Sequence, residues 1–303
     1  MKIGLMLGGG GAKGAYQVGI LKAFEELNFL DSIDIISGSS IGALNGYFYL
    51  SSHSVDNLYK AWLHGIKNNP LNKKKIPFDK KTKGLFTMDI VKEMAKIYTD
   101  EKIFRKATKD LYVILTKVEK PSIAQLIKRW SWEKVTIHLN NQEKPLDYVL
   151  SSSSIPIVFG FKEVGEDFFM DGGLSDNNPI DILIEKGCKV IFVSSLERFF
   201  SIKKYQQQGV TLIDLSCKEA LPSNIIRNYL SVIDFDEQLF KNRVNYGYFV
   251  AKKMIEYILE LQLFKLTAKK YKFIKKAEVS QRIDIPDYIK EEVKKMYDED
   301  HKK

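Results

Sequence analysis

The sequence predicts an α/β fold in which a mostly parallel central sheet is flanked by helices on both faces. Short apolar, β-branched runs alternate with stretches of helical spacing along most of the chain. The first two of these units each place a strand, a glycine turn and a helix in direct succession. Alternating strands and helices build sheets that helices cover on both faces.

The predicted elements follow this alternation in chain order. Residues 3–7 form a buried strand, glycines 8–11 end it, and apolar spacing from Ala15 to Leu27 gives a helix. Residues 33–36 form a second strand that leads to Gly38, and residues 41–50 form the next helix. Further strands are predicted at 111–118, 190–194 and 210–215, and further helices near 86–98, 145–152, 179–187 and 237–263.

The composition is typical of a globular protein, with 45% apolar and 28% charged residues. No stretch approaches the roughly 18 uninterrupted apolar residues of a membrane-spanning helix. The first strand is too short for the core of a signal peptide. Cys188 and Cys217 are the only cysteines, which argues against a disulfide framework and favours a reducing interior. We therefore expect a cytoplasmic protein, and export without a cleaved signal stays open.

A serine stands where the second predicted strand turns into a helix, in Gly38-Ser39-Ser40-Ile41-Gly42. A serine held at such a bend has an exposed hydroxyl, and the flanking glycines leave room for the tight turn. The helix N-terminus adds backbone donors that face the point of attack. Only Ser40 has glycines at both minus two and plus two, so Ser40 rather than Ser39 is the predicted nucleophile.

A second serine run, from Ser151 to Ser154, competes with this motif on composition alone. It has no flanking glycine and precedes Ile155-Pro156, where a helix usually ends. We therefore predict a helix end there rather than a nucleophile.

The first glycine loop, Gly9-Gly10-Gly11-Ala12-Lys13-Gly14, has two interpretations. It matches the dinucleotide-binding fingerprint, but that motif needs an acidic residue at the end of the second strand, where the chain has serines. In a hydrolase, the same glycines present backbone N–H groups to a developing oxyanion. The second interpretation explains both motifs together. A Walker-type phosphate loop is excluded because Lys13 precedes Gly14 rather than Ser or Thr.

The base that would activate the serine is predicted to be a carboxylate. The chain has only His53, His64, His138 and His301, and none has surroundings that suit a catalytic triad. Asp171 follows the apolar run 168–170 and precedes two glycines, so a strand delivers it to a tight turn. A hairpin turn is the competing interpretation of Asp-Gly. Burial would give Asp171 the basicity that a lone carboxylate lacks.

With these residues assembled, the chain resembles the patatin-like phospholipases. The resemblance is carried by the glycine loop, by the Ser40 pentapeptide, and by Asp171-Gly172-Gly173 followed by Asn177-Asn178-Pro179, in that order. It covers residues 1 to about 195. It implies a three-layer sandwich related to the α/β-hydrolase fold. We accordingly expect a patatin-like catalytic domain over residues 1–264 and a basic helical C-terminal extension over residues 265–303.

The resemblance also implies a chemistry: hydrolysis of acyl esters of phospholipids or neutral lipids by a Ser-Asp dyad, without a cofactor or a metal. Ser40 and Asp171 would be catalytic, and the loop of Gly9, Gly10 and Gly11 would form the oxyanion hole, with Gly10 and Gly11 as the main donors. Lys13 would fix the loop. The residues expected to support these motifs are Lys13, Gly14, Gly38, Gly42, Gly172 and Gly173.

The formal charge of +9 suggests an acidic partner, without choosing between a membrane and nucleic acid. Two lysine clusters stand out: Lys73, Lys74, Lys75, Lys80, Lys81 and Lys83, and Lys265, Lys269, Lys270, Lys272, Lys275 and Lys276 interleaved with Tyr271 and Phe273. The first is predicted as a loop and the second as a helix or a strand edge. Lysines beside aromatics suit an anionic membrane surface, and simple solvation explains them equally well.

We therefore expect a lipid ester substrate and peripheral contact with a membrane, but no nucleic acid, because no recognised module accompanies the charge. The oligomeric state is not predicted. Two other functions remain open: a catalytically silent lipid-binding protein with this fold, and a nucleotide-binding Rossmann oxidoreductase.

Overall fold

The computed structural model describes the chain except for residues 53, 69–87, 123–128, 207–208, 269, 275–281 and 303. Its contacts divide the chain into two compact units. Unit 1 consists of Met1–Met6, Gly10–Ile36 and Ile180–Lys303, and unit 2 consists of Leu7–Gly9 and Ser37–Pro179. Strands β1 and β2 each contribute residues to both units.

Unit 1 is built on parallel strands in the order β11-β8-β7-β1, with the start of β2 next to β1. β8 pairs parallel with both β7 and β11. Its strands are β1 (Lys2–Leu7), β7 (Cys188–Ser194), β8 (Thr211–Asp214), β9 (Phe264–Thr267), β10 (Lys270–Phe273) and β11 (Arg282–Ile283). Its helices are α1 (Ala15–Glu26), α9 (Asp181–Glu185), α10 (Ile225–Leu230), α11 (Glu237–Glu260) and α12 (Asp287–Asp300), with single turns η1 (Gly11–Gly14), η2 (Leu30–Ser32), η7 (Ile202–Tyr205) and η8 (Lys218–Ala220).

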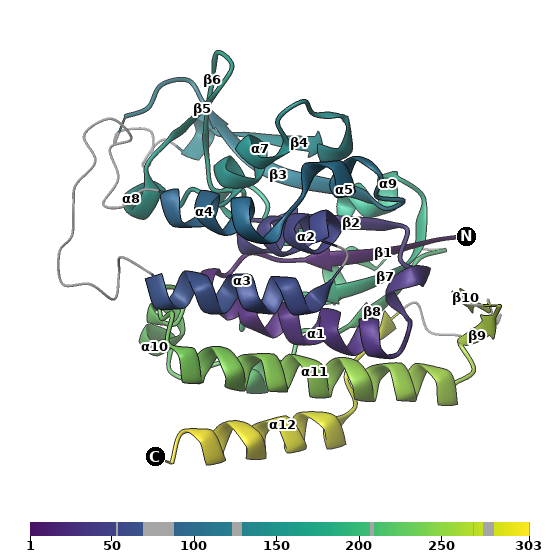
Figure 1. Cartoon of the computed structure of the whole chain (residues 1–303). Helices are drawn as coiled ribbons and strands as arrows, with labels where there is room; N and C mark the ends of the chain where they lie inside the picture. The colour runs from purple at the N-terminus through teal and green to yellow at the C-terminus, as the bar shows by residue number, and fades with distance from the viewer. Residues whose placement is uncertain are drawn as a thin grey trace. The chain divides into compact units, whose positions relative to one another are not determined.

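The core of unit 1 is apolar and rich in aromatic rings. Helices α1 and α11 lie side by side, and α12 packs on α11 (Figure 1). Phe24, Phe29 and Phe192 meet with ring centroids 5.2 to 5.4 Å apart. Such tilted and edge-on pairs add to the free energy gained from area burial alone. The antiparallel hairpin β9–β10 joins this core because Phe264 and Tyr271 both contact Phe29.

Unit 2 is built on the end of β2 (Ile35–Ser39) and on β3, in the order β2-β3-β6-β5, with β4 also pairing with β3. β3 is antiparallel to both β4 and β6. Its other strands are β3 (Asp110–Val118), β4 (Glu133–His138), β5 (Lys162–Val164) and β6 (Asp167–Met170). Its helices are α2 (Ile41–Ser52), α3 (Val55–Asn68), α4 (Asp89–Tyr98), α5 (Glu101–Arg105), α7 (Pro145–Ser152) and α8 (Pro156–Phe159), with single turns η4 (Arg129–Ser131), η5 (Leu139–Asn141) and η6 (Gly172–Leu174).

The predicted α/β class, with helices flanking a central sheet, is confirmed, and the sheet is mixed. Its antiparallel part consists of the pairs β3–β4, β3–β6 and β5–β6, and a hairpin links β5 to β6 through two residues. Gly165 has a φ of +64° in that link, a conformation that suits tight hairpin turns. The predicted strands and helices all appear, with ends shifted by a few residues, except that residues 86 and 87 lie outside the described part.

The proposed domain boundary at residue 264 stays a prediction. Beyond it the described residues form most of the β9–β10 hairpin, then β11 and α12. The described lysines of the second cluster, Lys265, Lys270 and Lys272, therefore lie on strands, and its aromatics Tyr271 and Phe273 pack inward against Phe29 and Phe264. The first cluster, from Lys73 to Lys83, lies outside the described residues, as do Lys269, Lys275 and Lys276.

Candidate active site

Ser40 occupies the bend between β2 and α2, with a backbone φ of +53°. This left-handed conformation is uncommon for a residue with a side chain and marks a sharp turn. The two flanking glycines are required sterically. A Cβ at Gly38 would overlap the backbone of Ala43, and one at Gly42 would overlap the carbonyl of Leu7.

The neighbouring Ser39 does not compete with Ser40. Its side chain is buried, and its Oγ finds no hydrogen-bond partner within the described part of the chain. The hydroxyl of Ser40 instead donates to Oδ2 of Asp171 at 2.5 Å. Of the two serines, only Ser40 thus bonds Asp171 through its hydroxyl in the described part of the chain.

The backbone of Ser40 is held on both sides by the serine run at the end of α7. The Ser40 N–H donates to Oγ of Ser152 at 3.0 Å, and Oγ of Ser153 donates to the Ser40 carbonyl at 3.0 Å. The first bond satisfies a buried N–H that the turn would otherwise leave unpaired, and the second adds to the bond that the same carbonyl accepts from the Leu44 N–H at 3.2 Å. The predicted helix end at this run is confirmed, since α7 ends at Ser152, but its contacts with Ser40 were not foreseen.

Asp171 follows β6 and is 5% exposed. Its Oδ1 accepts the N–H of Gly173 at 2.8 Å, while its backbone carbonyl accepts a hydrogen bond from Thr116 Oγ1, also at 2.8 Å. Burial raises the pKa of Asp171 to about 6, although the hydrogen bonds from Ser40 and Gly173 act in the opposite direction. A carboxylate of this pKa is a stronger base than an exposed one.

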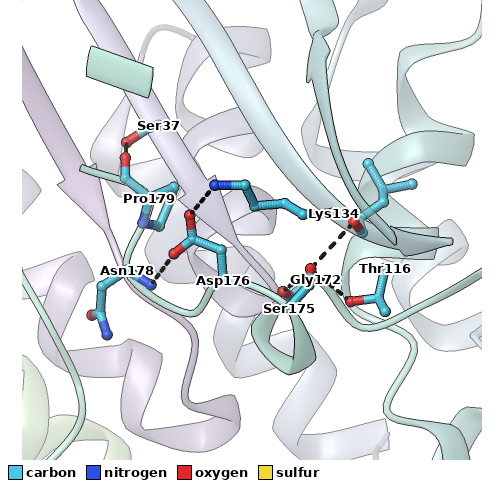
Figure 2. Close-up of polar contacts among 9 residues, drawn as sticks. Ser37, Thr116, Lys134, Gly172, Ser175, Asp176, Asn178 and Pro179 are labelled. Atoms are coloured by element: carbon cyan, nitrogen blue, oxygen red, sulfur yellow. Dashed lines mark hydrogen bonds and ion pairs between the residues drawn. The ribbon is translucent and has the colours of Figure 1, made fainter. Parts of the chain in front are cut away.

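The chain after Asp171 is fixed by a network of polar contacts (Figure 2). The carboxylate of Asp176 lies between Lys134 Nζ at 3.3 Å and the N–H of Asn178 at 3.2 Å. Ser175 contacts both Thr116 and the carbonyl of Gly172. The network joins the turn after Asp171 to β3 and β4, so it restricts where the carboxylate can lie.

Gly9, the first residue of the predicted oxyanion loop, lies beside Ser40, and a Cβ at Gly9 would be 3.1 Å from that of Ser40. The Gly9 N–H donates to the carbonyl of Asn177 at 3.1 Å, and Asn177 Nδ2 donates to the carbonyl of Gly9 at 3.3 Å. Because its N–H already has an acceptor, Gly9 is better suited to shaping the loop than to donating to an oxyanion.

In unit 1, the amides of Gly10 and Gly11 donate to no acceptor within the described part of the chain. Lys13 is buried, and its Nζ donates to the carbonyl of Leu196 at 2.8 Å. Burial and the nearby charge of Arg243 lower the pKa of Lys13 to about 8. Gly14 closes this turn and directly precedes α1.

The described histidines are engaged elsewhere. His64 Nε2 lies 3.1 Å from Glu93, His138 Nε2 lies 3.0 Å from Asp110, and His301 Nδ1 lies 2.7 Å from the carbonyl of Tyr297. His53 lies outside the described residues. Among the described residues there is no group of three or more His, Cys, Asp or Glu side chains arranged to hold a metal ion.

Comparison with known proteins assigns the fold and motifs to a family. The model of one family, described as patatin-like phospholipase, matches residues 5–184. The chain belongs to the patatin-like phospholipase family. The match ends close to the last motif, Asn177-Asn178-Pro179, so the patatin-like region holds every site residue predicted from the sequence.

Relatives and solved structures of this family are larger proteins. A lysophospholipase of Kluyveromyces lactis is 26% identical over 192 residues, which are 63% of this chain but 12% of that protein. A lysophospholipase of Aspergillus terreus is 53% identical over 57 residues, which are 19% of this chain and 4% of that protein. The structure of the ExoU-SpcU complex of Pseudomonas aeruginosa has a TM-score of 0.41 at 18% identity, covering 86% of this chain and 52% of that one.

None of the helices in the described part of the chain combines the length and the apolar character needed to cross a membrane.

The Ser152 hydroxyl is expected to act as a positioning group for Ser40. We predict that Ser152→Ala lowers the free energy of unfolding by about 1–3 kcal/mol, because it leaves the buried N–H of Ser40 without an acceptor. The same change should lower kcat for a soluble ester more than it changes KM. Urea unfolding and steady-state kinetics measure the two effects. Ser151→Ala is the matched control, since the Ser151 hydroxyl donates to the Asp147 carbonyl within α7. Equal effects in both variants would contradict the positioning role.

The buried carboxylate of Asp171 should make stability depend on pH. The pKa of Asp171 is about 6 in the folded chain against the ordinary aspartate value of 3.8. The contribution of this carboxyl to the free energy of unfolding is therefore fully present below pH 3.8 and is lost as pH rises through 6. Asparagine cannot ionise. We therefore predict that the free energy of unfolding of Asp171→Asn rises by up to about 3 kcal/mol relative to that of the wild type as pH increases from 3.8 to 6. Denaturant titrations at a series of pH values test this. If the free energies of unfolding of the two proteins differed by the same amount at all pH values, the result would argue against a raised pKa of Asp171.

Proposed function

We propose that this chain is a lipid acyl hydrolase of the phospholipase A or lysophospholipase type, in which Ser40 is the nucleophile and Asp171 is its base. The observation that carries the proposal is the buried hydrogen bond from Ser40 Oγ to Asp171 Oδ2. Membership of the patatin-like phospholipase family supports the choice of a lipid ester as substrate. The relatives named lysophospholipase support the same class.

The proposed reaction has two halves. Asp171 Oδ2 takes the proton of the Ser40 hydroxyl while Oγ attacks the acyl carbonyl carbon, and the tetrahedral intermediate collapses to an acyl-enzyme. Asp171 returns the proton to the departing alkoxide of the lipid. In the second half Asp171 takes a proton from water, the hydroxide attacks the acyl-enzyme, and Ser40 leaves with that proton as the fatty acid is released.

The raised pKa of Asp171 supports a dyad without a histidine. A base works best when its pKa lies near the working pH, and an exposed aspartate is too weak for this task. Burial brings the pKa of Asp171 to about 6. The Gly173 N–H fixes Oδ1, which leaves Oδ2 for Ser40.

Gly10 and Gly11 are the proposed donors to the oxyanion that forms on the substrate carbonyl. Their N–H groups have no acceptor in the described part of the chain, whereas the N–H of Gly9 is already bonded. Buried N–H groups are rarely left unpaired without a function. One such donor lowers the barrier of acyl transfer by roughly 3 to 4 kcal/mol. Lys13 would hold the loop in this shape through the carbonyl of Leu196.

The two alternatives have less support. A dinucleotide site needs a free carboxylate at the end of β2, but β2 ends in Ser39, and Asp34, which directly precedes β2, accepts the N–H of Ile3 at 2.8 Å. A silent lipid-binding protein would have no need for a strained serine that is hydrogen-bonded to a buried carboxylate. A cytoplasmic location with peripheral membrane contact, and activity without a cofactor, remain parts of the proposal.

The dyad can be tested with matched variants. We predict that a fluorophosphonate probe labels Ser40 in the wild type but does not label Ser40→Ala. Asp171→Asn should reduce hydrolysis by roughly 10²- to 10⁴-fold, because the amide cannot accept the proton. Asp214→Asn is the control, since burial also raises the pKa of Asp214 to about 6 but its carboxylate accepts the N–H of Ser216. Fatty acids and lysolipids released from mixed liposomes are the readout, and normal turnover in either dyad variant would refute the mechanism.

The rate should report the ionisation of Asp171. Because only the carboxylate form can accept the Ser40 proton, we predict that kcat/KM for a soluble ester falls as pH drops through about 6 and is level above it. The profile of Asp214→Asn should coincide with that of the wild type. An inflection near 4 in the wild type would mean that the base is exposed to solvent.

A further inference from the structure

The helix α10 in unit 1 exposes apolar side chains that have no role in the proposed chemistry. None of its residues is buried. Ile225, Ile226, Tyr229 and Leu230, together with the following Ile233, are between 44% and 74% exposed. Clustered apolar exposure of this kind marks a surface that another molecule covers. We call these five side chains the α10 surface.

A cavity of about 290 Å³ lies directly beside the α10 surface. Arg227 and Leu230 of α10 line it, together with Arg243 of α11 and Tyr297 of α12. The cavity therefore has apolar and aromatic walls with two guanidinium groups. Because Leu230 belongs to both the lining and the α10 surface, an amphiphile could touch both features at once.

The two arginines are not neutralised by ion pairs in the described part of the chain. Arg243 donates to the carbonyls of Asp234 and Ser231, and burial lowers its pKa. The side chain of Arg227 has no hydrogen bond or salt bridge there, although its backbone N–H is capped by Asn224. An incompletely compensated guanidinium favours a bound anion, with a planar fork suited to phosphate oxygens.

Carboxylates near the cavity leave an excess of positive charge on its lining. Asp234 also lines the cavity and acts to raise the pKa of Arg243, as does Asp236, which is not part of the lining. The carboxylate of Asp300 is occupied by the Tyr246 hydroxyl at 2.5 Å. The lining therefore has two arginines and one aspartate.

We propose that the cavity and the α10 surface together bind an anionic phospholipid at a membrane, with the phosphate at Arg227 and Arg243 and the α10 side chains among the acyl chains. The choice of a lipid as the occupant rests on the proposed function. Cationic groups beside exposed apolar side chains are the combination that interfacial proteins present to anionic bilayers. The inward packing of Tyr271 and Phe273 makes the second lysine cluster less suited to this role.

The α10 segment is also tied to the glycine loop. Val232, two residues beyond the end of α10, accepts the N–H of Ala12 at 2.7 Å, and its carbonyl lies where a Cβ on Gly11 would be. A lipid that holds α10 therefore acts on a segment in direct contact with the loop that carries the proposed oxyanion donors.

Vesicle sedimentation tests the proposal on the full chain. We expect the wild type to bind vesicles of phosphatidylcholine containing phosphatidic acid more tightly than vesicles of phosphatidylcholine alone. Arg227→Gln should weaken binding to the anionic vesicles about fivefold, and Ile226→Ser should weaken binding to both vesicle types about tenfold. Both side chains are exposed, so the variants should keep the wild-type unfolding temperature.

Arg129→Gln and Ile97→Ser are the controls, because they remove an exposed arginine and a 53% exposed isoleucine from unit 2. They should bind vesicles as the wild type does. Inorganic phosphate added as a competitor distinguishes the two sources of the anion. Displacement of the protein from the anionic vesicles at millimolar phosphate would mean that the cavity recognises phosphate itself. No displacement would mean that the lipid must supply the apolar contacts as well.

Wild-type protein that leaves both vesicle types unbound would overturn the proposal and indicate that α10 meets a protein, a second copy of this chain included. Equal binding by Arg227→Gln, Ile226→Ser and the wild type would overturn it as well. Hydrolysis of a soluble ester is measured in parallel. Absence of that activity in the wild type would contradict the proposed function and leave the binding result standing, so the two failures are distinguishable.

Discussion

The hydrogen bond between Ser40 and Asp171 is the interaction on which the rest of the site depends. Both groups are buried, so the carboxylate is deprived of water and its pKa rises to about 6. That loss of hydration is unfavourable for folding, but it raises the basicity of the aspartate towards that of a histidine. Further hydrogen bonds hold the two residues that form this bond. Ser152 and Ser153 hold the backbone of Ser40, and Thr116 with Gly173 holds Asp171.

The two units contribute different properties to the proposed enzyme. Unit 2 supplies a rigid nucleophile and base, delivered by a strand-to-helix turn and by the end of an antiparallel hairpin. Unit 1 supplies a glycine loop with unpaired amides, fastened through Lys13, and an exposed apolar helix beside two arginines. Polar groups buried without partners, and apolar groups exposed without cover, are both unfavourable in an isolated chain. The proposed oxyanion role would account for the unpaired amides, and the proposed contact with a phospholipid would account for the exposed apolar side chains.

Much of this arrangement could be predicted from the sequence because the motifs depend on local backbone geometry. Gly38 and Gly42 identify the turn at Ser40 since no other residue fits against Ala43 and Leu7. The mixed sheet was harder to predict, because β5 has only three residues and its hairpin depends on one glycine conformation. The serines of α7 contact Ser40 across 112 residues of sequence. Such long-range contacts leave no local pattern in the sequence. The helix α10 was missed for another reason, because six residues are too few for the spacing of their apolar side chains to identify a helix.

The left-handed backbone of Ser40 also limits which amino acid can serve there. Threonine carries the same hydroxyl, but a β-branched side chain crowds the backbone at a φ of +53°. Cysteine has no such branch and fits the same turn. The bend at the proposed nucleophile therefore selects among nucleophilic residues by shape before chemistry is considered. An exchange of serine for threonine, mild at most positions in a protein, would disturb the fold here.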